Sequence, residues 1–235
     1  MCAAMRAAMP AWLNGANLPE AVAPALPGKL ANLLVERCNV SRETLPRLEA
    51  YAALLCKWQK TINLVSNDSL NDLWTRHFVD SAQLYPLLPA SRPLKLFDLG
   101  SGAGFPGLVL AAIAAGNGAP IEAHLIESDR RKAAFLGQAA AALGVRVRVR
   151  AQRIEKTEPM LADVVTARAL APLGELLELA ARFCRPETIL VFPKGEKARL
   201  ELTAAERQWK MQAELLPSLS DQRGSIILIR ALSPR

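Results

Sequence analysis

The sequence predicts an α/β fold in which a doubly wound, mostly parallel sheet follows an N-terminal helical region. From residue 94 onward, short apolar strands alternate with helical segments, as in sheets whose parallel strands are joined by crossover helices. A glycine-rich turn, Gly100-Ser-Gly102-Ala-Gly104-Phe-Pro-Gly107, separates the first strand from the next helix. The 235 residues are enough for one such domain with an appendage.

The composition indicates a globular protein with a basic surface. Hydrophobic residues make up 51% of the chain and charged residues 22%, and the formal net charge is +7. A positive surface favours a polyanionic partner such as nucleic acid, although a basic enzyme with another substrate has the same composition. We expect no membrane span, because no apolar run reaches about 20 residues, and no signal peptide.

The cysteines predict neither a metal site nor a disulfide framework. They are four in number, they form no CxxC pair, and no histidine stands near them at ligand spacing: Cys2, Cys38, Cys56 and Cys184. Reduced thiols of this kind are typical of a cytoplasmic protein.

Three regions are expected along the chain. Residues 1–28, which contain four prolines, predict a loosely ordered extension. Residues 29–90 predict a helical region packed on the domain formed by residues 91–235. The expected helices of that region are Lys29–Arg37, Thr44–Val65 and about Ser69–Leu88. In the second helix, apolar residues recur at steps of three and four from Leu48 to Ile62 and therefore share one face.

The sheet domain is expected to contain seven strands. Five predicted parallel strands are Leu94–Leu99, Glu122–Ile126, Val145–Val149, Asp163–Thr166 and Thr188–Phe192. The helices between them are about Gly107–Ala115, Arg130–Leu143 and Pro172–Phe183. A charged helix, Glu196–Trp209, precedes two last strands, Met211–Leu215 and Ser225–Arg230, which we expect to pair antiparallel. The carboxyl ends of the first two strands are the expected ligand site.

The glycine turn predicts a nucleotide-like ligand. Glycine permits a tight turn and a close backbone approach, and the following helix directs its amide groups at the ligand. A turn of this kind can also be only a tight connection. Gly102, Gly104 and Gly107 match GxGxxG, which suggests a dinucleotide such as NAD. Asp98, however, completes Asp-x-Gly-x-Gly-x-Gly, the form found in methyltransferases that use S-adenosylmethionine (SAM), and we favour SAM.

Three further positions fit a Rossmann-like class I SAM site. Glu127 ends the second strand, where a carboxylate can accept hydrogen bonds from both ribose hydroxyls. Ile154-Glu155 follows the third strand, where methyltransferases commonly contact adenine. Arg168 follows the fourth strand, and there it can hold the cofactor carboxylate or an RNA phosphate by two parallel hydrogen bonds. Residues 91–235 are thus expected to form a SAM-binding methyltransferase domain.

The arginines of Val145-Arg-Val-Arg-Val-Arg150 alternate with valines and therefore share one face of a strand. They can form a phosphate-binding ridge, but an edge strand protected by its charges is the preferred interpretation. His124, inside the second strand, is expected to be packed and not catalytic.

The absence of two sequence motifs limits the kinds of methylation that the chain is expected to catalyse. The fourth strand is not followed by the Asn/Asp-Pro-Pro-Tyr motif of amine methylation, and Cys184, at a helix end, is a poor match to the nucleophile of pyrimidine C5 methylation. Guanine N7 needs no base, because its lone pair can attack the SAM methyl directly, so an enzyme acting there mainly aligns its two reactants.

The chain resembles the RsmG family, also called GidB, over about Leu48–Ile229. The motifs that carry the resemblance are Trp58-Gln-Lys-Thr-Ile-Asn63-Leu, His77-Phe-Val-Asp80-Ser81, the glycine turn with Asp98, Glu127-Ser with Arg131-Lys132 and Phe135-Leu136, Arg153-Ile-Glu155, Thr166-Ala-Arg168-Ala and Pro193-Lys194-Gly195. This family methylates guanine N7 in the decoding region of bacterial 16S ribosomal RNA. The resemblance therefore implies 16S rRNA, or the small ribosomal subunit, as partner of a cytoplasmic enzyme that we expect to be monomeric.

The resemblance also implies site residues. Those implied or expected to contact SAM are Gly100, Gly102, Phe105, Glu127, Ile154, Glu155 and Arg168; those implied on the RNA side are Asn63, Arg76, His77 and Lys194. His77 and Asp80 can instead bond each other, since they stand three apart on one helix. No residue is identified as catalytic in the strict sense, although Arg168 is the candidate for orienting cofactor or target, and no metal is expected. Two other functions stay open: a small-molecule methyltransferase, and a SAM-sensing RNA-binding or assembly protein without turnover.

Overall fold

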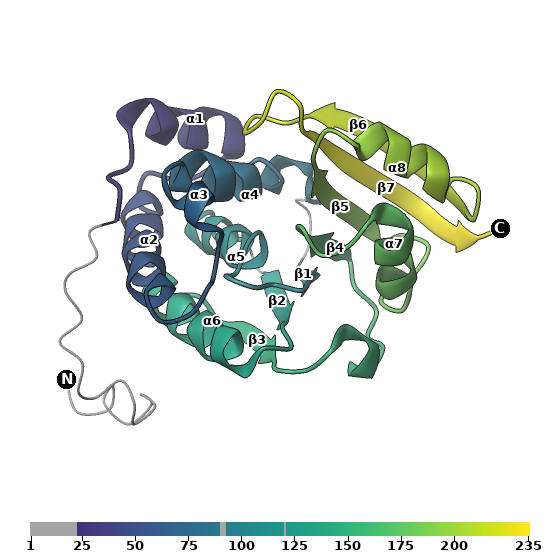
Figure 1. The fold of residues 1–235 in the computed structure, drawn as a ribbon, viewed down its shortest axis with the longest axis horizontal. Coiled ribbons are helices and arrows are strands. Elements are labelled where there is room, and N and C mark those ends of the chain that lie inside the picture. Colours follow the sequence, from purple (N-terminus) through teal and green to yellow (C-terminus); the bar gives the residue numbers. More distant parts are fainter. Residues whose placement is uncertain (1–22, 90–92, 120) are drawn as a thin grey trace.

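A seven-stranded sheet forms the centre of the computed structural model, which describes residues 23–89, 93–119 and 121–235 (Figure 1). The strand order is β3-β2-β1-β4-β5-β7-β6. All neighbouring pairs are parallel except those made by β7, which lies antiparallel between β5 and β6. The bounds are β1 (Leu94–Leu99), β2 (Ile121–Ile126), β3 (Val147–Arg150), β4 (Val164–Ala167), β5 (Ile189–Lys194), β6 (Trp209–Pro217) and β7 (Ser225–Pro234).

The predicted Rossmann-like, mostly parallel sheet with an antiparallel last pair is confirmed. Its strand order reverses between β1 and β4, which continue to opposite sides of the sheet. A crevice at the carboxyl ends of such strands is the usual ligand site of doubly wound folds. Residues 1–22 of the predicted N-terminal extension lie outside the described residues.

Helices cover both faces of the sheet. One face carries α5 (Gly107–Gly116), α6 (Arg130–Leu143) and the N-terminal helices, and the other carries α7 (Leu173–Ala181) and α8 (Ala198–Ala205). Helix α5 is buried over all of its first eight residues, because the sheet lies on one side of it and the N-terminal helices on the other. This explains why its sequence is apolar all round and not amphipathic.

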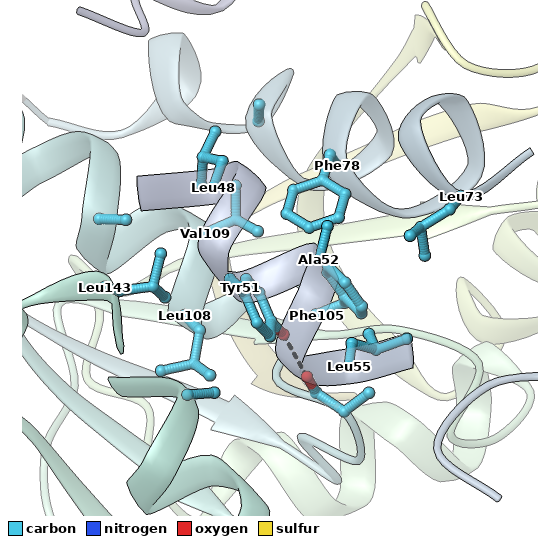
Figure 2. Packing of buried hydrophobic residues seen from close by; sticks show 14 of the residues in the cluster. Leu48, Tyr51, Ala52, Leu55, Leu73, Phe78, Phe105, Leu108, Val109 and Leu143 are labelled. Carbon is cyan, nitrogen blue, oxygen red and sulfur yellow. Dashed lines mark hydrogen bonds between the residues drawn. The ribbon is translucent and has the colours of Figure 1, made fainter. Parts of the chain in front are cut away.

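The N-terminal helices are α1 (Gly28–Cys38) and α2 (Leu45–Gln59), and α2 contacts the glycine turn. The predicted apolar face of α2 is confirmed: Leu48, Tyr51, Ala52 and Leu55 are fully buried against Phe78, Phe105 and α5 (Figure 2). The Tyr51 hydroxyl donates a hydrogen bond to the Ala103 carbonyl inside the glycine turn, drawn as a dashed line in Figure 2. The helical region thus contacts the loop that is expected to hold the cofactor.

Helix α2 is shorter than predicted, because a side chain takes over the backbone groups that a longer helix would use. The Gln59 amide oxygen accepts hydrogen bonds from the amides of Leu64 and Val65, at 2.9 and 3.1 Å, and its amide nitrogen donates to the Val65 carbonyl. The chain therefore turns after Gln59 instead of continuing to Val65.

The single helix predicted over Ser69–Leu88 is wrong. The segment consists of α3 (Asn67–Leu70), the π-helix η3 (Trp74–Val79), the short α4 (Asp80–Ala82) and the 3-10 helix η4 (Tyr85–Leu87). The wider turn of η3 and the missing amide of Pro86 break the regular i to i−4 ladder that helical spacing assumes. Short π-helices are frequent at functional sites, and this one carries Arg76 and His77.

Several of the other helices and strands begin or end a few residues away from their predicted bounds. Strand β3 begins at Val147 and not Val145, and the charged helix is only Ala198–Ala205, so that Trp209 begins β6. Strand β3 lies at the edge of the sheet, as the preferred interpretation of its arginines requires. Arg148 pairs with Glu122 at 2.7 Å on the neighbouring strand. His124 is fully buried and stacks on Phe97, which confirms that it is a packed residue.

Candidate active site

The glycine turn stands at the carboxyl end of β1, directly before α5. Gly100, Gly102 and Gly104 have φ values of 66°, 53° and 92°, which only glycine adopts without strain. A Cβ on Gly104 would also stand 2.8 Å from the Tyr51 hydroxyl. The turn is closed by a hydrogen bond from the Gly104 amide to the Ser101 carbonyl, at 2.6 Å. A side chain at Gly104 would therefore move the loop, and side chains at Gly100 and Gly102 would strain the backbone through their positive φ.

Asp98, the last but one residue of β1, is completely buried beneath the glycine turn and holds it by hydrogen bonds. Its carboxylate accepts hydrogen bonds from the Gly107 amide at 3.2 Å and from the Thr166 hydroxyl of β4 at 3.1 Å. Burial raises the pKa of Asp98 to about 6, and the hydrogen bonds it accepts oppose that rise. Asp98 thus fixes the two ends of the turn and links the turn to β4.

Glu127 follows β2 and lines the same cavity as the turn. One carboxylate oxygen accepts from the Gly102 amide and the other from the Asp129 amide, both at 2.8 Å. Each ionised carboxylate oxygen has two acceptor positions, so each can still accept a hydroxyl from a ligand. Glu127 therefore has the orientation and the acceptor capacity that a ribose-binding residue needs.

Ile154 and Glu155 lie in a 3-10 turn, η5 (Ile154–Lys156), after β3, and both line the cavity. The sequence did not point to Arg182, at the end of α7, whose guanidinium donates to the Glu155 carbonyl at 2.6 Å and to the Thr157 carbonyl at 3.2 Å. A side chain at the end of α7, on the same face of the sheet as Ile154, therefore fixes the loop predicted to contact adenine.

Arg168 follows β4 and is held by three groups of the N-terminal region. One terminal nitrogen donates to the Arg76 carbonyl at 2.8 Å and pairs with the Asp80 carboxylate at 3.5 Å, and the other lies 2.6 Å from His77 Nδ1. Its guanidinium carbon stands 5.1 Å above the centre of the Phe105 ring in the glycine turn. These partners use three of the five N–H donors, and the side chain lines the cavity.

His77 is buried and neutral. Because a guanidinium can only donate, Nδ1 is the acceptor and the proton is on Nε2, which donates to the Ser69 hydroxyl at 2.8 Å. Burial, together with the nearby charges of Arg168 and Arg76, lowers the pKa of His77 to about 3. His77 and Asp80 do not bond each other, as one interpretation allowed; both contact Arg168 instead.

The other residues implied on the RNA side have different surroundings. Arg76 is exposed and lines the cavity. Lys194 also lines it, but its ammonium already donates to the Ala171 carbonyl at 2.7 Å and to the Glu201 carboxylate at 2.8 Å. Asn63 lies on the exposed surface next to Leu64, which lines the cavity. Of these, Arg76 has the most freedom to meet a ligand.

One cavity of about 1190 Å³ joins these groups. Its wall includes the glycine turn, Glu127 and Ile154 on one side and Arg168 and Lys194 on the other. Pockets for a single small molecule usually measure about 300 to 1,000 Å³, so this cavity has room for a cofactor and part of a second ligand. In the described part of the chain, no group of three His, Cys, Asp or Glu side chains is placed to hold a metal ion, and no helix has both the length and the apolar character of a membrane span.

The sheet order, the glycine turn after β1 and the acidic residue after β2 define a Rossmann-like class I methyltransferase that uses SAM as methyl donor. Solved structures share the fold. A mutant of MtNAS crystallised with S-adenosylmethionine superposes with a TM-score of 0.51 at 16% identity, over 86% of this chain and 88% of that one. A structure described as a transferase from Pyrococcus horikoshii has a TM-score of 0.52 at 14% identity, over 66% and 63% of the two chains.

The chain belongs to the GidB family, whose sequence model, described as rRNA small subunit methyltransferase G, matches residues 44–232. Curated relatives carry the name ribosomal RNA small subunit methyltransferase G. The relative from Rhodospirillum centenum is 55% identical over 197 residues, which cover 84% of this chain and 88% of the relative. The relative from Paramagnetospirillum magneticum is 50% identical over 200 residues, or 85% and 95% of the two chains. The resemblance noted in the sequence is therefore confirmed.

Proposed function

We propose that this chain is a SAM-dependent methyltransferase of small-subunit ribosomal RNA and that its target atom is N7 of a guanine. The family and the names of the relatives support the reaction class and the RNA. The observation that carries the proposal is the single cavity in which a SAM-type glycine turn and Glu127 face Arg168 and Lys194. A cofactor and an anionic RNA segment can meet there. Such an enzyme acts where ribosomes are assembled, in the cytoplasm.

The residues proposed to hold the cofactor line the cavity at the carboxyl ends of β1, β2 and β3. SAM supplies an electrophilic methyl group on its sulfonium. The backbone of Gly100 and Gly102 would approach the cofactor closely, Glu127 would accept hydrogen bonds from its ribose hydroxyls, and Ile154 and Glu155 would contact the adenine. These residues fit the cofactor, because the turn contains no Cβ at its closest positions and because the Glu127 carboxylate retains free acceptor positions.

The residues around Arg168 support an N7 reaction. The N7 lone pair forms the new N–C bond while the electrons of the S–C bond return to sulfur, and no proton leaves the base. A general base is therefore unnecessary. His77, the one histidine on the cavity wall, is neutral and already accepts from Arg168, so it is occupied in a structural role. Phe105, Arg168 and the glycine turn align the two reactants and exclude water.

The test is methyl transfer from labelled SAM to small-subunit rRNA taken from cells that lack the modification. We expect label in one nucleotide that becomes cleavable by borohydride and aniline, which is the behaviour of N7-methylguanosine. Primer extension across the cleaved RNA locates it. Label that is resistant to this treatment would refute the N7 assignment, and transfer only to small molecules would refute the rRNA substrate.

A further inference from the structure

The turn between β6 and β7 forms the end of the cavity that lies farthest from the glycine turn along the sheet. Ser218, Ser220, Asp221, Gly224 and Ser225 line the cavity there. The sheet order places β1, β2 and β3, which carry the proposed cofactor contacts, on one side of β4, and β5, β7 and β6 on the other. Arg168, after β4, therefore stands between the proposed cofactor site and this turn.

Hydrogen bonds from the buried Gln83 fix the shape of the turn. The Gln83 amide oxygen accepts from the Leu219 amide at 2.6 Å, and its amide nitrogen donates to the Ser218 hydroxyl at 3.2 Å. Ser218 in turn accepts from the Ser220 amide at 3.1 Å. A wall that is held by such bonds is preorganised before a ligand arrives.

Asp80 joins this turn to Arg168. One of its carboxylate oxygens accepts from the Ser220 hydroxyl at 2.6 Å and from the Gln83 amide at 3.0 Å, and the other pairs with Arg168 at 3.5 Å. One carboxylate thus connects the N-terminal region, the loop after β4 and the C-terminal hairpin. A displacement of the turn would therefore also displace the Asp80 carboxylate that holds the Arg168 guanidinium.

We propose that the β6–β7 turn is the wall of the active site that receives the target guanosine nucleotide, and that Asp80 is the positioning residue that sets its place relative to Arg168. The proposed cofactor contacts lie on the β1–β3 side of Arg168, so the part of the cavity on the β5–β7 side is left for the target nucleotide. The Ser220 hydroxyl gives its proton to Asp80, and its oxygen can still accept a hydrogen bond from an N–H group of guanine. This inference rests on the proposed function.

The test compares Ser220→Ala with Ser220→Thr in the full-length protein. The alanine variant loses the bond to Asp80, whereas threonine keeps a hydroxyl. We expect Ser220→Ala to raise the KM for small-subunit rRNA about fivefold, the equivalent of one lost hydrogen bond. The SAM dissociation constant is expected to stay at the wild-type value, the melting temperature to fall by no more than about 2 to 4 °C, and Ser220→Thr to restore both the KM and the melting temperature. Ser233→Ala, at the exposed far end of β7, is the matched control.

Hydrogen exchange gives a second readout that does not depend on a variant. Amides of residues 218–221 should gain protection when rRNA is added to the wild-type protein with SAM, and not with SAM alone. An unchanged KM in Ser220→Ala, an equal loss of SAM affinity, or unprotected amides would each overturn the inference. A wild-type protein that transfers no methyl group to rRNA would refute the proposed function instead, so the two failures are distinguishable.

Discussion

The two ends of the cavity are built in different ways. At the cofactor end, the turn after β1 and Glu127 after β2 are bonded mainly through backbone amides of Gly102, Gly107 and Asp129. At the other end, side chains far apart in the sequence bond one another: Asp80 is 88 residues from Arg168 and 140 residues from Ser220. The geometry of the cofactor end is therefore set by local strands and turns. The geometry of the other end is set by contacts between distant parts of the chain.

This difference predicts how each end fails. A side chain added to the glycine turn acts through steric clash, since there is no room for a Cβ at Gly104 or Gly107. A change at the Arg168 end acts through lost polar bonds and leaves the backbone in place. The first should lower stability and SAM affinity together, whereas the second should separate activity from stability.

Gly107→Ala should have the largest effect. A Cβ at this position would stand 2.6 Å from Leu125 and 2.8 Å from Asp98, both fully buried. We expect a loss of about 2 to 3 kcal/mol in the free energy of unfolding, typical of overpacking in a core, and SAM binding weakened by more than about tenfold, because the turn must shift. Chemical denaturation and titration calorimetry measure the two effects.

Gly137→Ala is the matched control for that variant. Gly137 is exposed on α6 and nothing lies within 4 Å of its Cβ position. Alanine there should raise the free energy of unfolding by up to about 1 kcal/mol through helix propensity. Equal stability and equal SAM affinity in the two alanine variants would show that position 107 has room for a Cβ.

Arg168→Ala should abolish most of the activity while the fold is retained. We expect methyl transfer to fall about 100-fold, as when a residue that holds a reacting group in place is removed, and unfolding to change by at most about 2 kcal/mol. Circular dichroism and rRNA methylation are the measurements. The exposed Arg199→Ala is the control. Full activity in Arg168→Ala would remove this residue from the site.

The same variant decides which anion Arg168 holds, an alternative left open by the sequence. A weaker SAM dissociation constant would assign the cofactor carboxylate to Arg168. A higher KM for rRNA with unchanged SAM affinity would assign it an RNA phosphate.

The cofactor end could be predicted because its signals are local. Strand β1, the glycine spacing with Asp98, and Glu127 at the end of the next strand all follow from alternation and from the position of strand ends. Gly102 and Glu127 lie within hydrogen-bond distance in the structure. Their common location follows from the strand ends alone, without any prediction of a contact between them. Their roles toward SAM stay predictions.

The Arg168 end could not be predicted, because its geometry depends on a helix that periodicity describes wrongly. A regular helix over residues 69–88 would place His77 and Asp80 on one face, able to bond each other. Periodicity does not distinguish an α-helix from the π-helix η3. Nothing in the sequence indicates that Asp80 meets Ser220, since contacts between distant segments form only when the sheet is assembled.

Glu127→Gln should have a smaller and more selective effect. Glutamine keeps one oxygen acceptor but replaces the other with a donor, so one bond from Gly102 or Asp129 and one acceptor for ribose are lost. We expect SAM affinity to fall about tenfold, a value typical of a hydrogen bond to a charged group, with the KM for rRNA unchanged. Glu122→Gln, in β2 and paired with Arg148 of the neighbouring strand β3, should change neither value. A shifted rRNA KM in Glu127→Gln would contradict the separation of the two ends.

The smallest effect is the pH dependence that His77 gives to the Arg168 end. Because burial and two neighbouring arginines hold its folded-state pKa near 3, below the ordinary 6.5, the unfolded chain binds a proton that the folded chain rejects. Stability is therefore fully present above pH 6.5 and is lost as the pH falls toward 3. Between pH 7 and pH 5.5 this loss is about 1 kcal/mol. His77→Asn keeps an acceptor for Arg168 but does not titrate, so its unfolding free energy should fall less over that range in urea titrations. His124 is present in both proteins, and an identical pH slope would show that His77 is not held neutral in the folded protein.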